Sequence, residues 1–225
     1  SCYPFEMFIK CFLILLIMAD TSDIIVGYDA MEALWVNSMR RMFGKEVALD
    51  FTGARYEGDY TRGYVEAQAN KRAYVLDQVG FQPEHKVLDI GSGWGNMLKE
   101  ITEKGGQAQG LTLSPSQKKY CESNGWNARL QNWNDFNPSE LYDAVVSIGA
   151  FEHFCSIEDF QNGQQELIYE RFFDLVSRSL KPGKKLFLQT MTFGGIGAPD
   201  LETGVDAFAP FNSRARILGQ WRAYF

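Results

Sequence analysis

The sequence has few of the residues that build metal centres or disulfide frameworks. Its 225 residues include two histidines and four cysteines, and no two cysteines form a C-x-x-C pair. Neither zinc binding nor a disulfide scaffold is therefore indicated, and no metal is predicted as a cofactor. This cysteine usage fits a reducing compartment, so we expect a cytoplasmic protein.

Basic runs and long apolar runs are also scarce. The 22 Lys and Arg residues against 28 Asp and Glu residues give a net charge of −6, and no basic run exceeds two residues. This balance excludes nucleic acid as an expected partner. The apolar run at residues 11–19 is nine residues long, whereas a helix across a bilayer needs about 20. No transmembrane helix is therefore predicted.

Residues 1–18 differ from the rest of the chain and are interpreted as a leader. Lys10 precedes the apolar run and Ala19 follows it, as in a secretory signal, but Glu6 lies in the segment that should be basic. The main interpretation is therefore that translation began upstream of a true start at Met18, and a secretory signal is the alternative. The remainder is expected to comprise a helical cap and loop at 19–63 and one main domain at 64–225.

The chain is organised around residues 87–95, Val-Leu-Asp-Ile-Gly-Ser-Gly-Trp-Gly. The pattern predicts a short buried strand, a tight glycine turn and a helix that starts near Asn96. Glycines let a ligand approach the backbone, and the free N–H groups of the helix start point toward it. The dinucleotide fingerprint has its third glycine one residue later, so this spacing favours a nucleoside ligand without a diphosphate. The alternative is a purely structural turn.

Strands and helices alternate after this stretch. Ser114, Pro115 and Gln117 fit an N-cap, the first helical residue and the third residue after the cap. The alternation predicts an α/β fold: a mostly parallel, Rossmann-like sheet in three layers, with ligands beyond the carboxyl ends of its strands. The predicted strands are 87–90, 107–113, 128–131, 142–148 and 185–192, and the predicted helices are 96–104, one that starts at 115, and 166–180.

Two amphipathic helices are predicted before the glycine stretch. The helix at residues 28–43 ends at Gly44, and it either packs on the domain or forms a lid that contacts a lipid surface. An ordered loop at 50–63 leads to the second helix, at 64–79, which ends at Gly80. The apolar face of this second helix is expected to comprise Val65, Ala69, Ala73, Leu76 and Val79.

Four segments carry a family resemblance. They are Val-Leu-Asp-Ile-Gly-Ser-Gly-Trp-Gly at 87–95, Gly-Leu-Thr-Leu-Ser at 110–114 with Gln117, Ser-Ile-Gly-Ala-Phe-Glu-His-Phe at 147–154, and Glu-Ala-Gln at 66–68 with Lys71. Together they resemble the cyclopropane fatty acid synthase and mycolic acid cyclopropane synthase family. This family consists of class I S-adenosylmethionine-dependent methyltransferases. The likeness extends over residues 28–192, and the combination is more specific than any one segment.

The resemblance implies that the chain binds S-adenosyl-L-methionine. The glycine turn would hold the methionine part, and the residues after the second and third strands would contact the ribose and adenine. The cofactor-binding residues that it implies are Asp89, Gly91, Ser92, Gly93, Trp94, Gly95, Thr112, Leu113, Gln117, Trp133, Asn134 and Ile148. Alternatively, Gln117 only caps its helix and Trp133 is only a core aromatic.

Glu152 is the candidate catalytic residue. Methyl transfer from a sulfonium to an alkene leaves a carbocation, which a carboxylate and aromatic faces can stabilise. Glu152 follows the fourth strand and lies between Phe151 and Phe154 in the sequence. The alternative is a first-turn carboxylate favoured by the helix dipole. His153 is expected to face away from the site.

The sequence departs from the family at the site of ring closure. Ring-forming members hold a bicarbonate ion, the base that closes the ring, on a cysteine, a glutamate, a histidine, a tyrosine and a backbone carbonyl. The resemblance places the glutamate at Glu152 and the carbonyl at Ile148, which is therefore a second catalytic candidate. The cysteine position is Ala54 and the histidine position is Gln189. Two ligands are missing, which argues against bicarbonate and against ring closure.

The tyrosine of that site has no match in the sequence, because only residues 193–225 follow the fifth strand. Family members continue for two more strands, so the C-terminal part is expected to be truncated.

The sequence therefore predicts a methyltransferase that transfers a methyl or methylene group to an unsaturated acyl chain of a lipid, with peripheral contact to the membrane. The alternatives are transfer to a small-molecule amine or other heteroatom, and a relative that binds the cofactor without catalysis. A nicotinamide-dependent oxidoreductase is disfavoured by the glycine spacing and by Thr112, where a ribose-binding acid would lie. The sequence does not set the oligomeric state.

Overall fold

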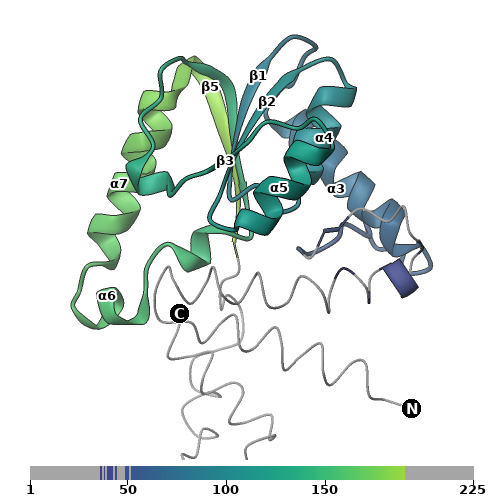
Figure 1. Ribbon diagram of the computed structural model, residues 1–225, viewed down its shortest axis with the longest axis horizontal. Helices are drawn as coiled ribbons and strands as arrows, with labels where there is room; N and C mark the ends of the chain where they lie inside the picture. Colours follow the sequence, from purple (N-terminus) through teal and green to yellow (C-terminus); the bar gives the residue numbers. More distant parts are fainter. Residues whose placement is uncertain are drawn as a thin grey trace, which may run out of the picture.

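A computed structural model describes residues 36, 38, 40–42, 44, 49–50 and 52–190. In this part, five parallel strands form one sheet in the order β3-β2-β1-β4-β5, with helices on both of its faces (Figure 1). The strands are β1 (Lys86–Ile90), β2 (Gln107–Thr112), β3 (Ala128–Leu130), β4 (Tyr142–Ile148) and β5 (Leu180–Gln189). The predicted three-layer, Rossmann-like fold is confirmed.

The strand order positions the site. The chain runs outward from β1 to β3 and then returns to place β4 on the other side of β1. The direction of winding therefore reverses between β1 and β4. In such sheets the connecting loops separate at this point and leave a crevice beyond the carboxyl ends of the strands.

Two hydrophobic clusters attach the helices to the sheet. Successive strand residues point to opposite faces, so Val87 packs on one face while Leu88 packs on the other. The Val87 face is covered by helices α3 and α4, and the Leu88 face by helix α7, whose Phe172 is fully buried (Figure 1). The helices are α3 (Tyr64–Gln78), α4 (Asn96–Glu103), α5 (Pro115–Ser123), α6 (Ile157–Gln161) and α7 (Gln165–Ser179), with short 3-10 turns η1 (Trp133–Asp135) and η2 (Phe151–His153).

The last strand begins earlier than predicted. Pro182 and Gly183 indicate a break after the helix, and α7 does end at Ser179, but the strand starts at once at Leu180. Tyr142 is opposite Leu180, whereas Ala144 is already opposite Lys185, so the residues between them bulge out of the ladder. Proline and glycine are tolerated at such a bulge because no ladder hydrogen bond is required there. Helix α6 was not predicted, although its Ser156–Asp159 capping box is a recognisable start signal.

The apolar face predicted for α3 is confirmed in its second half, where Leu76 and Val79 are buried, and is wrong in its first half. Val65 and Ala73 are exposed, and the buried residues there include Gln68 and Lys71. The first half of this helix packs against a polar segment rather than against the sheet. Periodicity in apolar residues therefore misplaces the buried face in this half of the helix.

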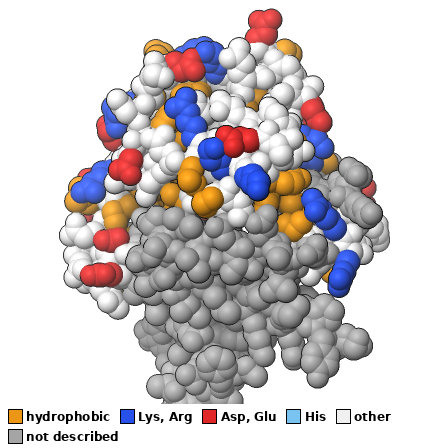
Figure 2. Space-filling view, viewed as in Figure 1, with side chains coloured by type: hydrophobic (Ala, Val, Ile, Leu, Met, Phe, Trp, Pro, Cys, Tyr) orange, Lys and Arg blue, Asp and Glu red, His pale blue; other side chains and the backbone are white. Residues whose placement is uncertain are grey.

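Part of the predicted cap can be followed. Residues 36, 38 and 40–42 are helical, and the N–H of Gly44 donates to the carbonyl of Arg40 at 3.1 Å, as expected for a helix that ends there. Residues 1–18 and 193–225 lie outside the described residues. Among the described helices, none is long and apolar enough to span a bilayer. Figure 2 shows acidic and basic side chains interspersed on one face of the described part.

Candidate functional site

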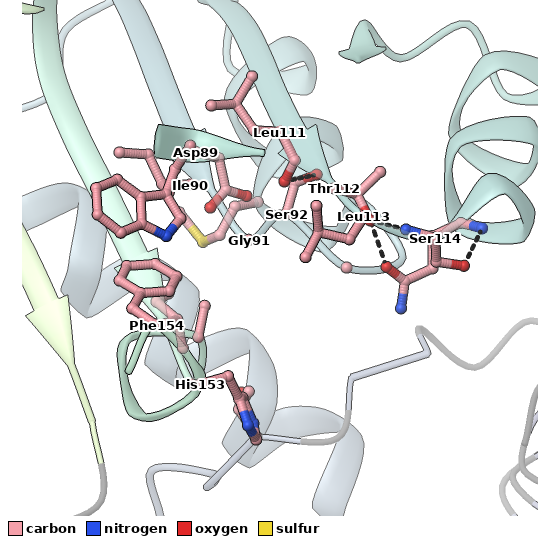
Figure 3. Close-up of a pocket in the computed structure, with 18 of the residues that line it drawn as sticks. Asp89, Ile90, Gly91, Ser92, Leu111, Thr112, Leu113, Ser114, His153 and Phe154 are labelled. Atoms are coloured by element: carbon pink, nitrogen blue, oxygen red, sulfur yellow. Dashed lines mark hydrogen bonds between the residues drawn. The ribbon is translucent and has the colours of Figure 1, made fainter. Parts of the chain in front are cut away.

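A cavity of about 390 Å³ lies beyond the carboxyl ends of β1, β2 and β4 (Figure 3). It therefore occupies the crevice that the strand order creates. The predicted cofactor residues that line it are Asp89, Gly91, Ser92, Gly93, Trp94, Thr112, Leu113, Gln117, Trp133, Asn134 and Ile148. Gly95 is absent from the described lining. The structure thus brings together residues that come from four separate loops.

The glycine turn forms the floor of the cavity. Gly91 has φ of 83°, and a Cβ built on it would be 2.3 Å from the Cβ of Ala150. Gly95 has φ of 78°, and its Cβ would be 2.7 Å from the Sγ of Cys121 in α5. These two glycines are therefore required by backbone conformation and by close packing against protein. At Gly93 no atom lies within 4 Å of a built Cβ, so this glycine borders open space.

Asp89 supplies a carboxyl group to the cavity at the end of β1 (Figure 3). It is 3% exposed. Burial, together with the nearby charge of Asp50, raises the pKa of Asp89 to about 7. Near neutral pH this carboxyl is therefore close to its midpoint, and a cationic ligand would favour its ionised form.

The end of β2 is held by a small polar network. The hydroxyl of Thr112 donates to Oε1 of Gln117 at 2.6 Å and accepts from the N–H of Ser114 at 3.2 Å (Figure 3). The N–H of Gln117 in turn donates to Oγ of Ser114 at 3.2 Å, which confirms the predicted N-cap. Gln117 therefore has the structural role and also lines the cavity.

Trp133 likewise packs on the core and lines the cavity. Its ring centroid is 4.9 Å from that of Phe154 and 5.7 Å from that of Phe172, so it packs on the core below α7. It also lines the cavity beside Asn134. An aromatic wall fixed by two neighbouring rings is suited to the face of a flat heterocycle.

The prediction that His153 faces away is wrong. His153 is among the residues that line the cavity, although its ring lies apart from that of Phe154 (Figure 3). Burial lowers the pKa of His153 to about 4, so its imidazole is neutral at pH 7. Hydropathy does not predict that His153 lines the cavity, because η2 is too short to show a periodic pattern. The direction of its side chains depends instead on the path of the loop after β4.

Glu152 lies at the edge of the cavity and is 7% exposed. It is outside the described lining, and its Oε2 accepts a hydrogen bond from the Thr190 hydroxyl at 3.0 Å. A Cβ built on Gly149 would be 3.9 Å from Oε1 of Glu152 and 2.9 Å from Cγ2 of Thr52. The Glu152 carboxylate therefore lies close to Gly149, at the end of β4.

The positions that correspond to a bicarbonate site also converge there. Ile148 is paired with Gln189 across the sheet, and Nε2 of Gln189 is 3.6 Å from a Cβ built on Gly53, which precedes Ala54. The residues present do not fit the anion. Ala54 has no polar side-chain atom, and Gln189 stands where the resemblance places a histidine, so two of the expected ligands are missing.

Sequence reasoning missed one wall of the cavity. It is formed by Leu49, Asp50, Thr52, Lys71 and Arg72. Of these five residues, the sequence indicates only Lys71, as part of the family resemblance, and it assigns Lys71 no function. Among the described residues, no group of three or more His, Cys, Asp or Glu side chains could hold a metal ion.

Comparison with known proteins gives consistent matches. A family model described as "Mycolic acid cyclopropane synthetase" matches residues 20–196. Cyclopropane mycolic acid synthase 1 of Mycobacterium tuberculosis is 35% identical over 136 residues, which are 56% of this chain and 43% of that protein. The chain spans about half the length of the curated relatives it matches.

Solved structures of such proteins have the same architecture. Mycolic acid cyclopropane synthase CmaA1 complexed with SAH and CTAB aligns with a TM-score of 0.55 and 28% identity, over 72% of this chain and 55% of that one. The cyclopropane synthase MmaA2 from Mycobacterium tuberculosis aligns with a TM-score of 0.55 and 26% identity, over 77% of this chain and 55% of that one.

Proposed function

Because the chain belongs to the mycolic acid cyclopropane synthetase family, we propose that it is an S-adenosylmethionine-dependent methyltransferase that acts on an unsaturated acyl chain of a lipid. The observation that carries the proposal is the cavity at the reversal point of the sheet, with the glycine turn, Asp89, Gln117 and Trp133 in its wall. CmaA1, to which the chain is similar, has been solved with SAH.

The residues of the cavity fit this cofactor. The open space beside Gly93 admits a ligand close to the backbone, and Asp89 offers a carboxylate to the α-ammonium group of the methionine part. The Gln117 carboxamide and the Trp133 ring offer a polar contact and a flat apolar face for a nucleoside. When bound, S-adenosylmethionine supplies the methyl group on a positively charged sulfur.

The chain's own residues would then orient the acceptor and stabilise charge. In this proposal Glu152 faces the positive charge that develops on the attacked carbon chain, and Phe151 and Phe154 keep water away. The Ile148 carbonyl is a second acceptor at the same edge. Since Ala54 and Gln189 do not fit bicarbonate, the proposal does not include ring closure. It covers transfer of the methyl group, with release of S-adenosylhomocysteine and loss of a proton from the cation to solvent, which leaves a methyl-branched chain.

The same two residues favour a second candidate function. Methyl transfer to an amine or another heteroatom does not require a bicarbonate base that closes a ring. Ala54 and Gln189, which replace two bicarbonate ligands, are therefore compatible with such a reaction. The two candidates share the cofactor and differ in the acceptor.

We also propose a cytoplasmic enzyme that contacts the membrane surface where its lipid lies. The helix predicted for 28–43 has two exposed residues near its end, Arg41 and Met42, and Met42 is 54% exposed. A basic and an apolar side chain side by side are suited to contact with a membrane surface.

Binding of S-adenosylhomocysteine by the purified protein is expected to be tighter than binding of NAD. The glycine spacing differs from that of the dinucleotide fingerprint, in which the third glycine comes one residue later. Isothermal titration calorimetry with both ligands measures the difference, and tighter binding of NAD would contradict the cofactor assignment.

Affinity for S-adenosylhomocysteine is expected to fall as the pH decreases through about 7. Below that pH the free protein holds Asp89 protonated, because burial raises the pKa of Asp89 to about 7. A protonated carboxyl cannot balance the ammonium group of the ligand, whereas the carboxylate above pH 7 can. Calorimetry at pH 6 and pH 8 checks this, with Asp89→Asn as the control that should show weak and pH-independent binding. Equal wild-type affinity at both pH values would remove Asp89 from the contact.

A further inference from the structure

One wall of the cavity is a segment that precedes the main domain. We call residues 49–55 the strap; the structure describes all of them except Phe51. Leu49, Asp50 and Thr52 of the strap line the cavity. On its other side, Thr52 lies against Gly149 at the end of β4. The strap therefore lies between helix α3 and the carboxyl ends of the strands.

Helix α3 holds the backbone of the strap. The Tyr64 hydroxyl donates to the carbonyl of Asp50, and Nε2 of Gln68 donates to the carbonyl of Thr52 at 2.7 Å. The N–H of Arg55 donates to the carbonyl of Ala67 at 3.1 Å. Three hydrogen bonds with one helix thus set the path of the strap, whose described residues belong to no helix or strand.

Lys71 holds the side chains of the strap. Its Nζ donates to both carboxylate oxygens of Asp50, at 3.0 and 3.1 Å, and to the hydroxyl of Thr52. The Thr52 hydroxyl donates to Asp50 at 2.7 Å, which closes the network. Lys71 is 5% and Asp50 is 7% exposed. A buried lysine whose three donors all go to one segment fixes that segment in one position.

The charges around Asp50 make this lysine necessary. Asp50 faces Lys71 and Arg72 of α3. Its negative charge also contributes, after burial, to the raised pKa of Asp89 at the end of β1. Arg72 is 3.8 Å from Asp50 and is shared, since its Nε donates to Glu100 of α4 at 3.2 Å. Without Lys71, Asp50 and Asp89 would both border the cavity, and Asp50 would keep only the arginine that it shares with Glu100.

We propose that Lys71 is a positioning residue for the cofactor. It fastens Asp50 and Thr52 so that the strap forms a fixed wall of the cavity, and it compensates the Asp50 charge beside Asp89. The strap would therefore already be ordered when the cofactor binds, so that binding does not have to supply the free energy of ordering it. This inference rests on the proposed function, because the ligand of the cavity is taken to be S-adenosylmethionine.

The test is calorimetric titration of S-adenosylhomocysteine into four variants between pH 6 and pH 8. Lys71→Met is expected to raise Kd by about tenfold or more and to move the pH midpoint of binding upward, because the uncompensated Asp50 charge raises the pKa of Asp89 further. The double variant Lys71→Met with Asp50→Asn should regain part of the affinity and lose the upward shift. Gln68→Met, whose side chain is outside the described cavity lining, should weaken binding through the strap alone. Lys99→Met, an exposed lysine of α4, is the matched control and should bind like the wild type.

The outcomes separate this inference from the proposed function. If the wild type does not bind S-adenosylhomocysteine, the proposed function fails. If the wild type binds and Lys71→Met has the same Kd and the same pH midpoint, Lys71 has no positioning role. Should Lys71→Met fail to fold, wild-type affinity in Gln68→Met would overturn the inference by itself. A double variant as weak as Lys71→Met, with an unchanged midpoint, would contradict the charge compensation.

Discussion

Replacement of Glu152 by Gln is expected to lower the rate of methyl transfer by about 100-fold or more while affinity for S-adenosylhomocysteine stays close to that of the wild type. The carboxylate is the charge that would stabilise a cation on the acceptor, and it lies behind Gly149, outside the described lining of the cofactor cavity. Gln has the same shape and can still accept from the Thr190 hydroxyl, so the fold should be retained. Initial rates with labelled cofactor and calorimetry on the same preparation measure the two quantities.

Glu158→Gln is the matched control for this variant. Glu158 is an exposed carboxylate of α6, a few residues farther along the chain, and its replacement should leave both quantities unchanged. Full activity in Glu152→Gln would reduce Glu152 to a first-turn carboxylate of η2. A parallel loss of activity and of cofactor binding would indicate a structural role instead of a catalytic one.

Replacement of Gly91 by Ala is expected to destabilise the fold by about 2–4 kcal/mol and to abolish binding of S-adenosylhomocysteine. An alanine there must adopt φ of 83° and would place its Cβ 2.3 Å from the Cβ of Ala150, a distance at which one of the two backbones has to move. Both belong to the cavity wall, so the movement deforms the site as well as the core. Urea unfolding gives the change in the free energy of unfolding, and calorimetry gives the loss of binding.

Gly93→Ala shares the unfavourable φ without the overlap. Its φ is 52°, and nothing lies within 4 Å of the built Cβ. The expected cost is about 1–2 kcal/mol, from backbone conformation alone. If Gly91→Ala were as stable as Gly93→Ala, the close approach of the glycine turn to Ala150 would not exist in solution.

Features set by neighbouring residues could be predicted from the sequence. The apolar run at β4 marks a strand without reference to other segments, and its bounds, Tyr142–Ile148, are those predicted. Ser114 and Pro115 fix a helix start by local capping chemistry. Because parallel strands bring their carboxyl ends to one edge, the residues after each strand could also be assigned to one site.

Features set by contacts distant in sequence could not be predicted. The buried face of α3 depends on the strap, which begins at residue 49 and offers polar rather than apolar partners to Gln68 and Lys71. The early start of β5 depends on pairing with Tyr142, which overrides the local signal of Pro182 and Gly183. The orientation of His153 depends on how the neighbouring rings of Phe151 and Phe154 pack on Phe172 of α7. In each case tertiary packing decides between locally equivalent alternatives.

The central claim is that this chain transfers a one-carbon group from S-adenosylmethionine to an unsaturated acyl chain. The most direct measurement is incubation of the protein with methyl-labelled S-adenosylmethionine and a lipid extract, followed by mass spectrometry of the labelled acyl chains. Label is expected on chains that were unsaturated, in wild-type protein and not in Glu152→Gln. Label confined to amines or other heteroatoms, or no labelled lipid from protein that binds S-adenosylhomocysteine, would contradict the central claim.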